Sequence, residues 1–416
     1  MRLLYSFGLR LYALLLRLLS PFVPKAAAWT DGRHGLLDRI QEQLRDEKAP
    51  LVWFHCASLG EFEQGRPLME AYQTEYPDHK LVLTFFSPSG YEVRHNWPGA
   101  DYVFYLPLDT GANARAFLDA VKPRLAVFVK YEFWYYFLRE LQRRAIPTIC
   151  VSAIFRSEQV FFQPWGGFFR RTLGFFTHIF TQNQASAELL RGAGLRGVSV
   201  AGDTRFDTVL RTASAPPRHL PLIEAFTDDW CPVLIVGSSW AEDIAVLTPL
   251  LQQYQQELRF IVAPHEINEA NLRRVEAALP GQVVRYSQAE AATVANARLL
   301  LIDNVGLLSF LYRFGHFAYV GGAFGKGLHN TLEAAAFGLP LLFGPTYHKF
   351  QEAQDLVELG CAFPVSSSDE LLKAFGMLYH REEARLQVQD QSLDYVHDHS
   401  GATRKIMSWM QAEQVK

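Results

Sequence analysis

Cysteine is scarce in this sequence and is never paired at short spacing. The 416 residues contain four cysteines, Cys56, Cys150, Cys231 and Cys361, which lie far apart. Zinc sites use closely spaced Cys and His ligands, and small disulfide scaffolds are dense in cysteine. The sequence therefore argues against a structural zinc site and against a disulfide framework, and it fits a reducing compartment.

A large excess of one charge is also missing. The chain has 40 Lys and Arg against 43 Asp and Glu, which gives a net charge of −3. It therefore lacks the general basicity that would indicate a nucleic-acid partner. The spacing of the ATP-binding glycine-lysine loop is absent too, which argues against an ATPase. With no internal repeat and no low-complexity segment, the length fits two large α/β domains.

The first 28 residues have no acidic side chain, since Asp31 is the first. On a helix, the polar or small residues form one narrow stripe, and Leu, Phe and Tyr fill the remaining surface: the stripe is Arg2, Ser6, Arg10, Ala13, Arg17 and Ser20. Arginines are costly in the middle of a bilayer. We therefore expect residues 1–28 to form an amphipathic anchor helix that lies in the membrane interface with its basic face toward the head groups. Pro21 and Pro24 would break it. A cleaved signal peptide and an ordinary docking helix are the alternatives.

From residue 51, short apolar runs alternate with helical stretches, which predicts parallel, doubly wound sheets. The expected strands of the first domain are 51–55, 81–85, 102–106, 125–129, 148–151 and 179–181, with helices at 113–121 and 133–144 among those between them. Those of the second domain are 233–237, 260–263, 283–285, 299–302, 317–320 and 341–343. The sequence predicts a first domain over 29–210, a loop-rich linker over 211–221 and a second domain over 222–398. In such a pair the active site is expected in the cleft between the domains.

The most informative stretch is 317–345, which predicts a buried strand, a glycine-rich loop, a helix over 330–337 and a second strand. A glycine loop before a helix is suited to anion binding because free N–H groups point at the ligand. The candidate anion ligands are Gly325, Lys326, Gly327, His329 and Asn330, and Glu333 is placed to bind ribose hydroxyls. A plain tight turn is the alternative.

Further candidates follow other predicted strands, at the sheet edge where ligands of open α/β sheets bind. In the first domain, Ser58 and Gly60 precede Glu61, a candidate general base at the start of a helix. A favourable first-turn charge is the alternative. Glu132 follows a strand at the same edge and is a candidate substrate ligand, although a solvated charge is the alternative. In the second domain the corresponding candidates are Ser238, Ser239, Pro264 and His265.

Together these motifs resemble the Kdo transferases, which attach 3-deoxy-D-manno-octulosonic acid (Kdo) to lipid A precursors in lipopolysaccharide biosynthesis. The resemblance runs nearly end to end. It is carried by 29–33 (WTDGR), 58–61 (SLGE), 131–134 (YEFW), 202–207 (GDTRFD), 237–240 (GSSW) and 321–333 (GGAFGKGLHNTLE). It implies a GT-B fold of two Rossmann-like domains, with a C-terminal helix over 399–416 that crosses back to the first domain.

The resemblance also implies an activity: inverting transfer of Kdo from the donor CMP-Kdo to a lipid A precursor, lipid IVA, at the cytoplasmic face of the inner membrane. Glu61 would be the catalytic base, Ser58, Gly60 and Glu132 would bind the acceptor, and no cofactor or essential metal is expected. Ala263-Pro264-His265 lacks the basic residue that the family has before this region. A GT-B enzyme that uses a UDP-sugar, a same-fold epimerase and a non-catalytic nucleotide-sugar sensor are the alternatives.

Overall fold

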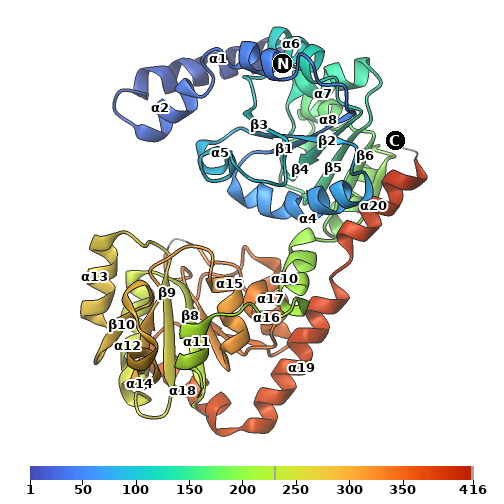
Figure 1. Ribbon diagram of the computed structural model, residues 1–416. Coiled ribbons are helices and arrows are strands. Elements are labelled where there is room, and N and C mark those ends of the chain that lie inside the picture. Colours follow the sequence, from blue (N-terminus) through green and yellow to red (C-terminus); the bar gives the residue numbers. More distant parts are fainter. Residues whose placement is uncertain (229–230, 326, 414–416) are drawn as a thin grey trace. The chain divides into compact units, whose positions relative to one another are not determined.

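The protein consists of two compact units in the computed structural model, which describes residues 1–228, 231–325 and 327–413. The first unit contains residues 1–207 and 400–416, and the second contains residues 208–399. Each unit has a seven-stranded parallel sheet. Figure 1 shows helices on both faces of each sheet.

The first sheet has the strand order β3-β2-β1-β4-β5-β6-β7. Its strands are β1 (Leu51–Cys56), β2 (Lys80–Phe85), β3 (Tyr102–Tyr105), β4 (Leu125–Val129), β5 (Thr148–Ala153), β6 (His178–Thr181) and β7 (Val198–Val200). Every residue of β1 is buried, and successive side chains enter opposite faces: Trp53 joins one core and Phe54 the other. From β1 the chain adds β2 and β3 on one side, and β4 then returns to the other side of β1. Ligands of such sheets bind where this order reverses, so they are expected at the carboxyl ends of β1 and β4.

Helices cover both faces of this sheet, and the last helix of the chain is one of them. The helices of the first unit are α1 (Arg2–Leu19), α2 (Pro24–Asp31), α3 (Leu36–Gln43), α4 (Leu59–Glu75), α5 (Pro88–Arg94), α6 (Gly111–Val121), α7 (Tyr135–Arg143), α8 (Gly167–Leu173), α9 (Gln184–Gly192) and α20 (Ala402–Ala412). Helix α10 (Thr204–Ser214) begins in the first unit and ends in the second. Ile406 and Met410 of α20 pack into the same core as Phe54. Asp207 accepts hydrogen bonds from the N–H groups of residues 401 and 403, which fixes the start of α20 to the first unit.

The second sheet has the order β10-β11-β9-β8-β12-β13-β14, and the order in which strands are added reverses between the parallel neighbours β8 and β12. Its strands are β8 (Val233–Ser239), β9 (Arg259–Pro264), β10 (Val283–Arg285), β11 (Leu299–Leu301), β12 (Phe317–Val320), β13 (Leu341–Phe343) and β14 (Ala362–Pro364). Its helices are α11 (Pro221–Phe226), α12 (Ala241–Gln253), α13 (Glu269–Ala278), α14 (Ala291–Asn296), α15 (Leu308–Leu311), α16 (Leu332–Ala335), α17 (Gln351–Glu358), α18 (Ser368–His380) and α19 (Glu382–Asp398).

Each strand expected from the sequence is present, but some boundaries were wrong. The helix expected over 330–337 is a single turn, α16, because Asn330 accepts a hydrogen bond from the Leu332 N–H group and Gly338 adopts a left-handed φ of 71°. The linker expected over 211–221 begins inside α10, which continues to Ser214, and the loop that follows is correspondingly shorter.

The predicted N-terminal helix is divided into α1 and α2, which meet at an angle of 119°. No single helix among the described residues is long and apolar enough to cross a membrane, and only this bent pair meets the length and composition criteria together. The polar stripe of α1 turns partly toward the protein, contrary to expectation: the Ser6 hydroxyl hydrogen-bonds to that of Tyr136 at 2.6 Å. Tyr5, beside the stripe, donates to Asp109 at 2.6 Å. The exposed surface of α1 is largely apolar, and it includes Leu3, Leu4, Phe7, Leu11, Leu14, Leu15 and Leu18.

Candidate functional site

In the first unit, the predicted base lies where the sheet changes direction. β1 ends at Cys56, and α4 begins three residues later with Ser58 as its N-cap residue. Gly60 and Glu61 occupy the first turn of α4, and the Ser58 hydroxyl donates a hydrogen bond to the Glu61 carboxylate. Glu61 is half-buried. The hydrogen bond from Ser58 orients this carboxylate at the start of the helix, and a carboxylate is a group that can accept a proton.

Glu132 lies at the carboxyl end of β4, and a buried network fixes its position. Its Oε2 atom lies 2.7 Å from the Trp134 Nε1 atom, which donates to it, and 3.1 Å from the Nε2 atom of His55. His55 is fully buried, whereas the Glu132 side chain is 12% exposed. The Nδ1 atom of His55 lies 2.9 Å from the hydroxyl of Thr84. One carboxylate oxygen of Glu132, Oε2, is thus held by His55 and Trp134.

His55 was not among the residues predicted to form the site. The available signal was a polar residue inside the otherwise apolar run Leu51–Cys56, since a buried histidine needs hydrogen-bond partners. Its partners come from β2 and from the segment after β4, which no local pattern connects to it.

The carboxylates of Glu61 and Glu132 both influence the pKa of Cys56. Burial raises the pKa of Cys56, and the carboxylates of Glu61 and Glu132 raise it further. Burial also raises the pKa of Tyr131; Arg156 lowers it and Glu61 raises it. The structure thus brings both predicted acids of the first unit to one edge of the sheet. Glu61 and Arg156 have opposite effects on the pKa of Tyr131 there.

In the second unit, the residues predicted to bind the sugar donor lie at the carboxyl ends of β8, β9 and β12. The N–H group of Gly321 donates to the carbonyl of Gly237, and that of His265 to the carbonyl of Ser239. The N–H group of His329 donates to the carbonyl of Gly321. These bonds connect the ends of β8, β9 and β12 with the glycine loop, at the edge where ligands of doubly wound sheets bind.

Two glycines of this loop are sterically required. A Cβ atom on Gly321 would come within 2.5 Å of the Ser238 carbonyl oxygen, and one on Gly322 within 2.2 Å of the Gly327 carbonyl oxygen. Gly322 also has a left-handed φ of 97°. Gly325 has no atom within 4 Å of such a Cβ, so it faces open space. Lys326, which was predicted to add a cation here, lies outside the described residues.

Asp243 of α12 holds the loop in place and was missed by the sequence analysis. This fully buried carboxylate accepts hydrogen bonds from the N–H groups of Trp240 at 2.8 Å and Gly322 at 2.9 Å, and from the Tyr319 hydroxyl at 2.9 Å. Burial raises its pKa. The signal was an acid at the third position of a helix, where it can bond to the cap N–H group. Its contacts with β12 and the glycine loop have no local signature.

Three aromatic rings form a stack beside the loop. His265 lies between Trp240, with ring centroids 4.7 Å apart, and His329, at 4.4 Å. Trp240 donates its indole N–H to the Nε2 atom of His329 at 3.0 Å. Burial, and secondarily His265, lowers the pKa of His329 to about 4. His329 is therefore neutral near pH 7, and because its Nε2 atom accepts, its Nδ1 atom carries the proton and is a donor.

The remaining predicted donor residues surround this stack. Asn330 donates to Glu333 at 3.1 Å, and Pro264 ends β9 beside Ser239. Ser238 has a left-handed φ of 54°, which is rare for a residue with a side chain and marks a strained turn. The hydroxyl of Ser239 is buried and has no hydrogen-bond partner in the described chain, and a ligand oxygen would satisfy it.

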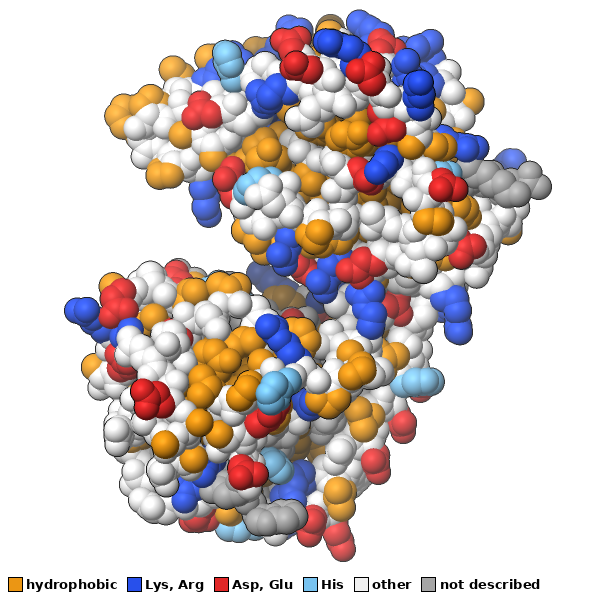
Figure 2. All heavy atoms as spheres, viewed as in Figure 1, with side chains coloured by type: hydrophobic (Ala, Val, Ile, Leu, Met, Phe, Trp, Pro, Cys, Tyr) orange, Lys and Arg blue, Asp and Glu red, His pale blue; other side chains and the backbone are white. Residues whose placement is uncertain are grey.

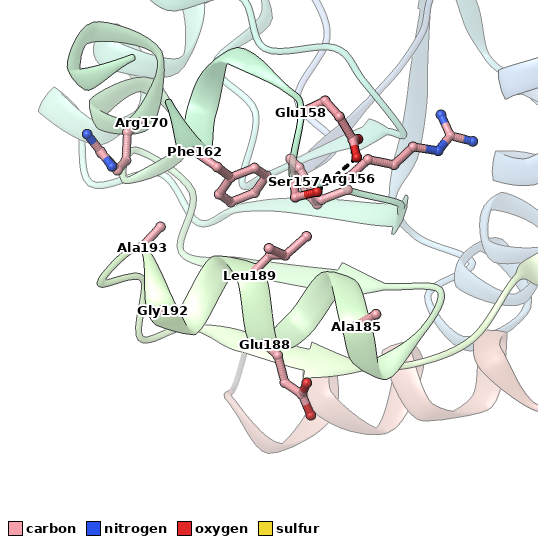
Figure 3. Close-up of a pocket in the computed structure, with 11 residues that line it drawn as sticks. Arg156, Ser157, Glu158, Phe162, Arg170, Ala185, Glu188, Leu189, Gly192 and Ala193 are labelled. Carbon is pink, nitrogen blue, oxygen red and sulfur yellow. Dashed lines mark hydrogen bonds between the residues drawn. The ribbon is translucent and has the colours of Figure 1, made fainter. Parts of the chain in front are cut away.

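The part of the chain that the structure describes has no group of three or more His, Cys, Asp or Glu side chains suited to hold a metal ion. A separate cavity of about 780 Å³ lies in the first unit between the loop after β5 and α9. Figure 3 shows Phe162 and Leu189 facing each other across it, with Arg156 at one end and Arg170 at the other. Ser58, Gly60, Glu61 and Glu132 do not line it.

Comparison with known proteins agrees with these features. Residues 31–208 match the family model described as 3-deoxy-D-manno-octulosonic-acid transferase (kdotransferase). The 3-deoxy-D-manno-octulosonic acid transferase of Chlamydophila psittaci is 26% identical over 359 residues, which cover 82% of this chain and 80% of the relative. That of Aquifex aeolicus is 25% identical over 361 residues, 85% of this chain and 93% of the relative. The chain is a homologue of the Kdo transferases.

The resemblance to the Kdo transferases that the sequence predicted is thereby confirmed, and this homologue is a glycosyltransferase. Among solved structures, UDP-GlcNAc 2-epimerase from Neisseria meningitidis, bound to UDP-GlcNAc, superposes with a TM-score of 0.61 at 16% identity, covering 87% of this chain and all (100%) of that one. A putative UDP-N-acetylglucosamine 2-epimerase from Listeria monocytogenes gives 0.60 at 15% identity, with coverages of 88% and 97%. These likenesses concern the fold alone, and with the two seven-stranded sheets they confirm the predicted GT-B fold class.

Proposed function

We propose that this Kdo transferase homologue moves Kdo from CMP-Kdo to a hydroxyl of a lipid A precursor, lipid IVA, with inversion and without a metal ion. Each unit supplies one half of the chemistry. The first carries a carboxylate suited to proton removal, and the second carries a set of fixed donors suited to a phosphate.

On the donor side, the phosphate of CMP-Kdo lies against the glycine loop. The Nδ1–H group of neutral His329, the hydroxyl of Ser239 and the main chain around Gly325 and Gly327 donate to its oxygens. Glu333 accepts from the ribose hydroxyls, with Asn330 holding one of its carboxylate oxygens. When the bond from the anomeric carbon to the phosphate breaks, CMP leaves with the electron pair. Donors fixed in advance stabilise the growing charge more in the transition state than in the ground state.

On the acceptor side, Glu61 removes the proton of the attacking hydroxyl as its oxygen bonds to the anomeric carbon from the opposite face. The hydrogen bond from Ser58 aligns the Glu61 carboxylate. Glu132 keeps one oxygen, the one not bound by His55 and Trp134, for a sugar hydroxyl of the acceptor.

The proposal places the first unit at the cytoplasmic face of the inner membrane. The largely apolar exposed surface of α1 would enter the interface, while Tyr5 and Ser6 fasten the helix to the protein. An enzyme held this way meets an acceptor whose acyl chains stay in the bilayer.

The observation that carries the proposal is the position of Glu61, at the carboxyl end of β1 in a Kdo transferase homologue. The test is transfer of Kdo from CMP-Kdo to a tetra-acylated lipid A precursor in the presence of EDTA. A second arm measures competition by CMP and by UDP for CMP-Kdo binding. Product in EDTA with CMP as the stronger competitor supports the proposal. Preference for UDP would move it to a UDP-sugar donor, and binding without transfer would leave a sensor or a different acceptor.

A further inference from the structure

A second cavity lies beside the N-terminal helix, within the first unit. It has a volume of about 580 Å³ and is lined by parts of α1, α2, α3 and the loop that follows β3. Arg17, Trp29, Asp31, Arg33 and Asp38 are among its lining residues, and no residue proposed above for donor or acceptor is. Its volume lies in the range of small-molecule sites.

Two groups of this cavity, one buried donor and one largely buried cation, bear on what it could bind. Trp29 is 5% exposed, and its indole N–H has no hydrogen-bond partner in the described ranges. Arg33 donates to the main-chain carbonyls of residues 29, 86 and 106, and its guanidinium lies against the rings of Trp29, Phe86 and Tyr105. In the described ranges it has no Asp or Glu within ion-pair distance, so its charge has no carboxylate partner. Burial lowers the pKa of Arg33 to about 9, so it stays charged near neutrality. A buried cation without a counter-ion and an unpaired donor both favour an anion in the cavity.

The exposed part of the lining carries both signs of charge. Arg17 on α1, Asp31 at the end of α2 and Asp38 on α3 are all exposed, and none forms an ion pair within the described chain. Two cations and two carboxylates thus line one cavity. A purely anionic ligand would leave the carboxylates unmatched, whereas a zwitterion would match both signs.

The lining side chains indicate which kind of ammonium group such a ligand carries. A quaternary ammonium group is typically bound by aromatic faces. The face of Trp29 is already covered by the Arg33 guanidinium, whose central carbon lies 4.1 Å from the ring centroid. Carboxylates instead suit a primary ammonium group, which donates hydrogen bonds.

The surroundings indicate that the ligand belongs to a lipid. On α1, Leu14, Leu15 and Leu18 are about half exposed or more and lie next to Arg17 in the sequence. The turn to α2 exposes Phe22, which is 82% accessible. Figure 2 shows hydrophobic side chains at the outer end of this helix pair. Acyl chains attached to a head group in the cavity would continue over this surface.

We propose that this cavity binds the phosphoethanolamine head group of a membrane lipid. Arg17, Arg33 and the N–H group of Trp29 hold the phosphate, and Asp31 and Asp38 hold the ammonium. This deepens the membrane placement proposed above and rests on it for the setting in the cell, but the binding itself requires no transfer activity.

The test is calorimetric titration of the full chain with dihexanoyl-phosphatidylethanolamine below its critical micelle concentration. Arg17→Gln removes one exposed charge and is expected to weaken binding about tenfold, which corresponds to about 1.4 kcal/mol, because a charge-assisted hydrogen bond to the phosphate is lost. Arg10→Gln is the matched control, because Arg10 is also exposed on α1 but does not line the cavity, and its affinity is expected to stay within about twofold. Trp29→Phe keeps the ring and is expected to weaken binding without lowering the melting temperature.

The same titration with other short-chain lipids decides the head group. Clearly tighter binding of phosphatidylethanolamine than of phosphatidylcholine, phosphatidylglycerol or phosphatidic acid supports the proposal. Equal binding of phosphatidylcholine, or tighter binding of either anionic lipid, overturns it, as does absence of binding to the folded protein. If the head group binds as expected but no Kdo is transferred, the failure concerns the proposed function and not this cavity.

Discussion

Replacing Asp243 by alanine should destabilise the second unit and displace the glycine loop. The buried carboxylate accepts three hydrogen bonds, from the N–H groups of Trp240 and Gly322 and from the hydroxyl of Tyr319. Without it, three buried donors lose their acceptor, at a cost of about 1–3 kcal/mol each. Some donors will find water, and removing the carboxylate also relieves the burial that raises the Asp243 pKa. We therefore expect a net loss of about 3–5 kcal/mol.

Glu242→Ala is the matched control, because Glu242 precedes Asp243 on α12 but is exposed. It should cost at most about 1 kcal/mol, as expected for a first-turn surface charge. Differential scanning calorimetry can separate the unfolding of the two units, for which a single two-state fit is not valid. Hydrogen exchange of peptides that contain residues 317–325 reports on the loop, and titration with CMP reports on the site. If Asp243→Ala were no more destabilising than Glu242→Ala, and the loop amides stayed protected, Asp243 would not hold the loop.

Two further predictions concern the loop and the N-terminal helix. Gly322→Ala should lower the stability of the second unit by at least about 1–2 kcal/mol and abolish CMP binding, because its Cβ would meet the Gly327 carbonyl and its φ is left-handed. Gly325→Ala is the control and should leave the melting temperature unchanged. Equal melting temperatures for the two variants would contradict this prediction. Burial raises the pKa of Asp109 from 3.8 to about 6, so this group's contribution to folding is most favourable at low pH and is lost as the pH rises from about 4 to about 6, by about 3 kcal/mol. Asp109→Asn should remove that slope from urea unfolding measured between pH 4 and 7, and a slope that persists would show that other groups cause it.

Patterns along the chain were sufficient to predict the two sheets. Long buried runs such as 125–129 stand out from the helical stretches around them, because parallel strands are apolar on both faces. β7 and β14, two edge strands of three residues, were not predicted, although β10, equally short and also at an edge, was. The length of α16 was overestimated because residues 330–337 favour helix, while the main chain there is fixed by the loop before it.

In the candidate site too, residues with a local sequence signal were predicted and residues with distant partners were not. Glu61 and Glu132 were predicted because each follows a buried strand, and parallel strands bring their carboxyl ends to one edge of the sheet. His329 was predicted from the glycine loop that follows β12. His55 and Asp243 were missed because their partners are distant in the sequence, with Thr84 and Tyr319 as examples. The orientation of the α1 stripe was also misjudged. A periodic pattern indicates that a helix has two faces, but Tyr5 and Ser6 decide by their contacts which of them meets the protein.

The most direct test of the account is the rate of Kdo transfer by Glu61→Gln compared with Glu63→Gln. Glu63 lies on the same helix and forms ion pairs with Arg66 and Arg94, so its replacement removes a carboxylate from α4 without touching the proposed base. Loss of a general base typically lowers the chemical rate by about 10²–10⁴-fold. We expect that loss in single-turnover experiments with Glu61→Gln, with CMP-Kdo affinity unchanged, and a rate near that of the unmodified protein with Glu63→Gln. A Glu61→Gln protein that transfers Kdo at the unmodified rate would contradict the central claim.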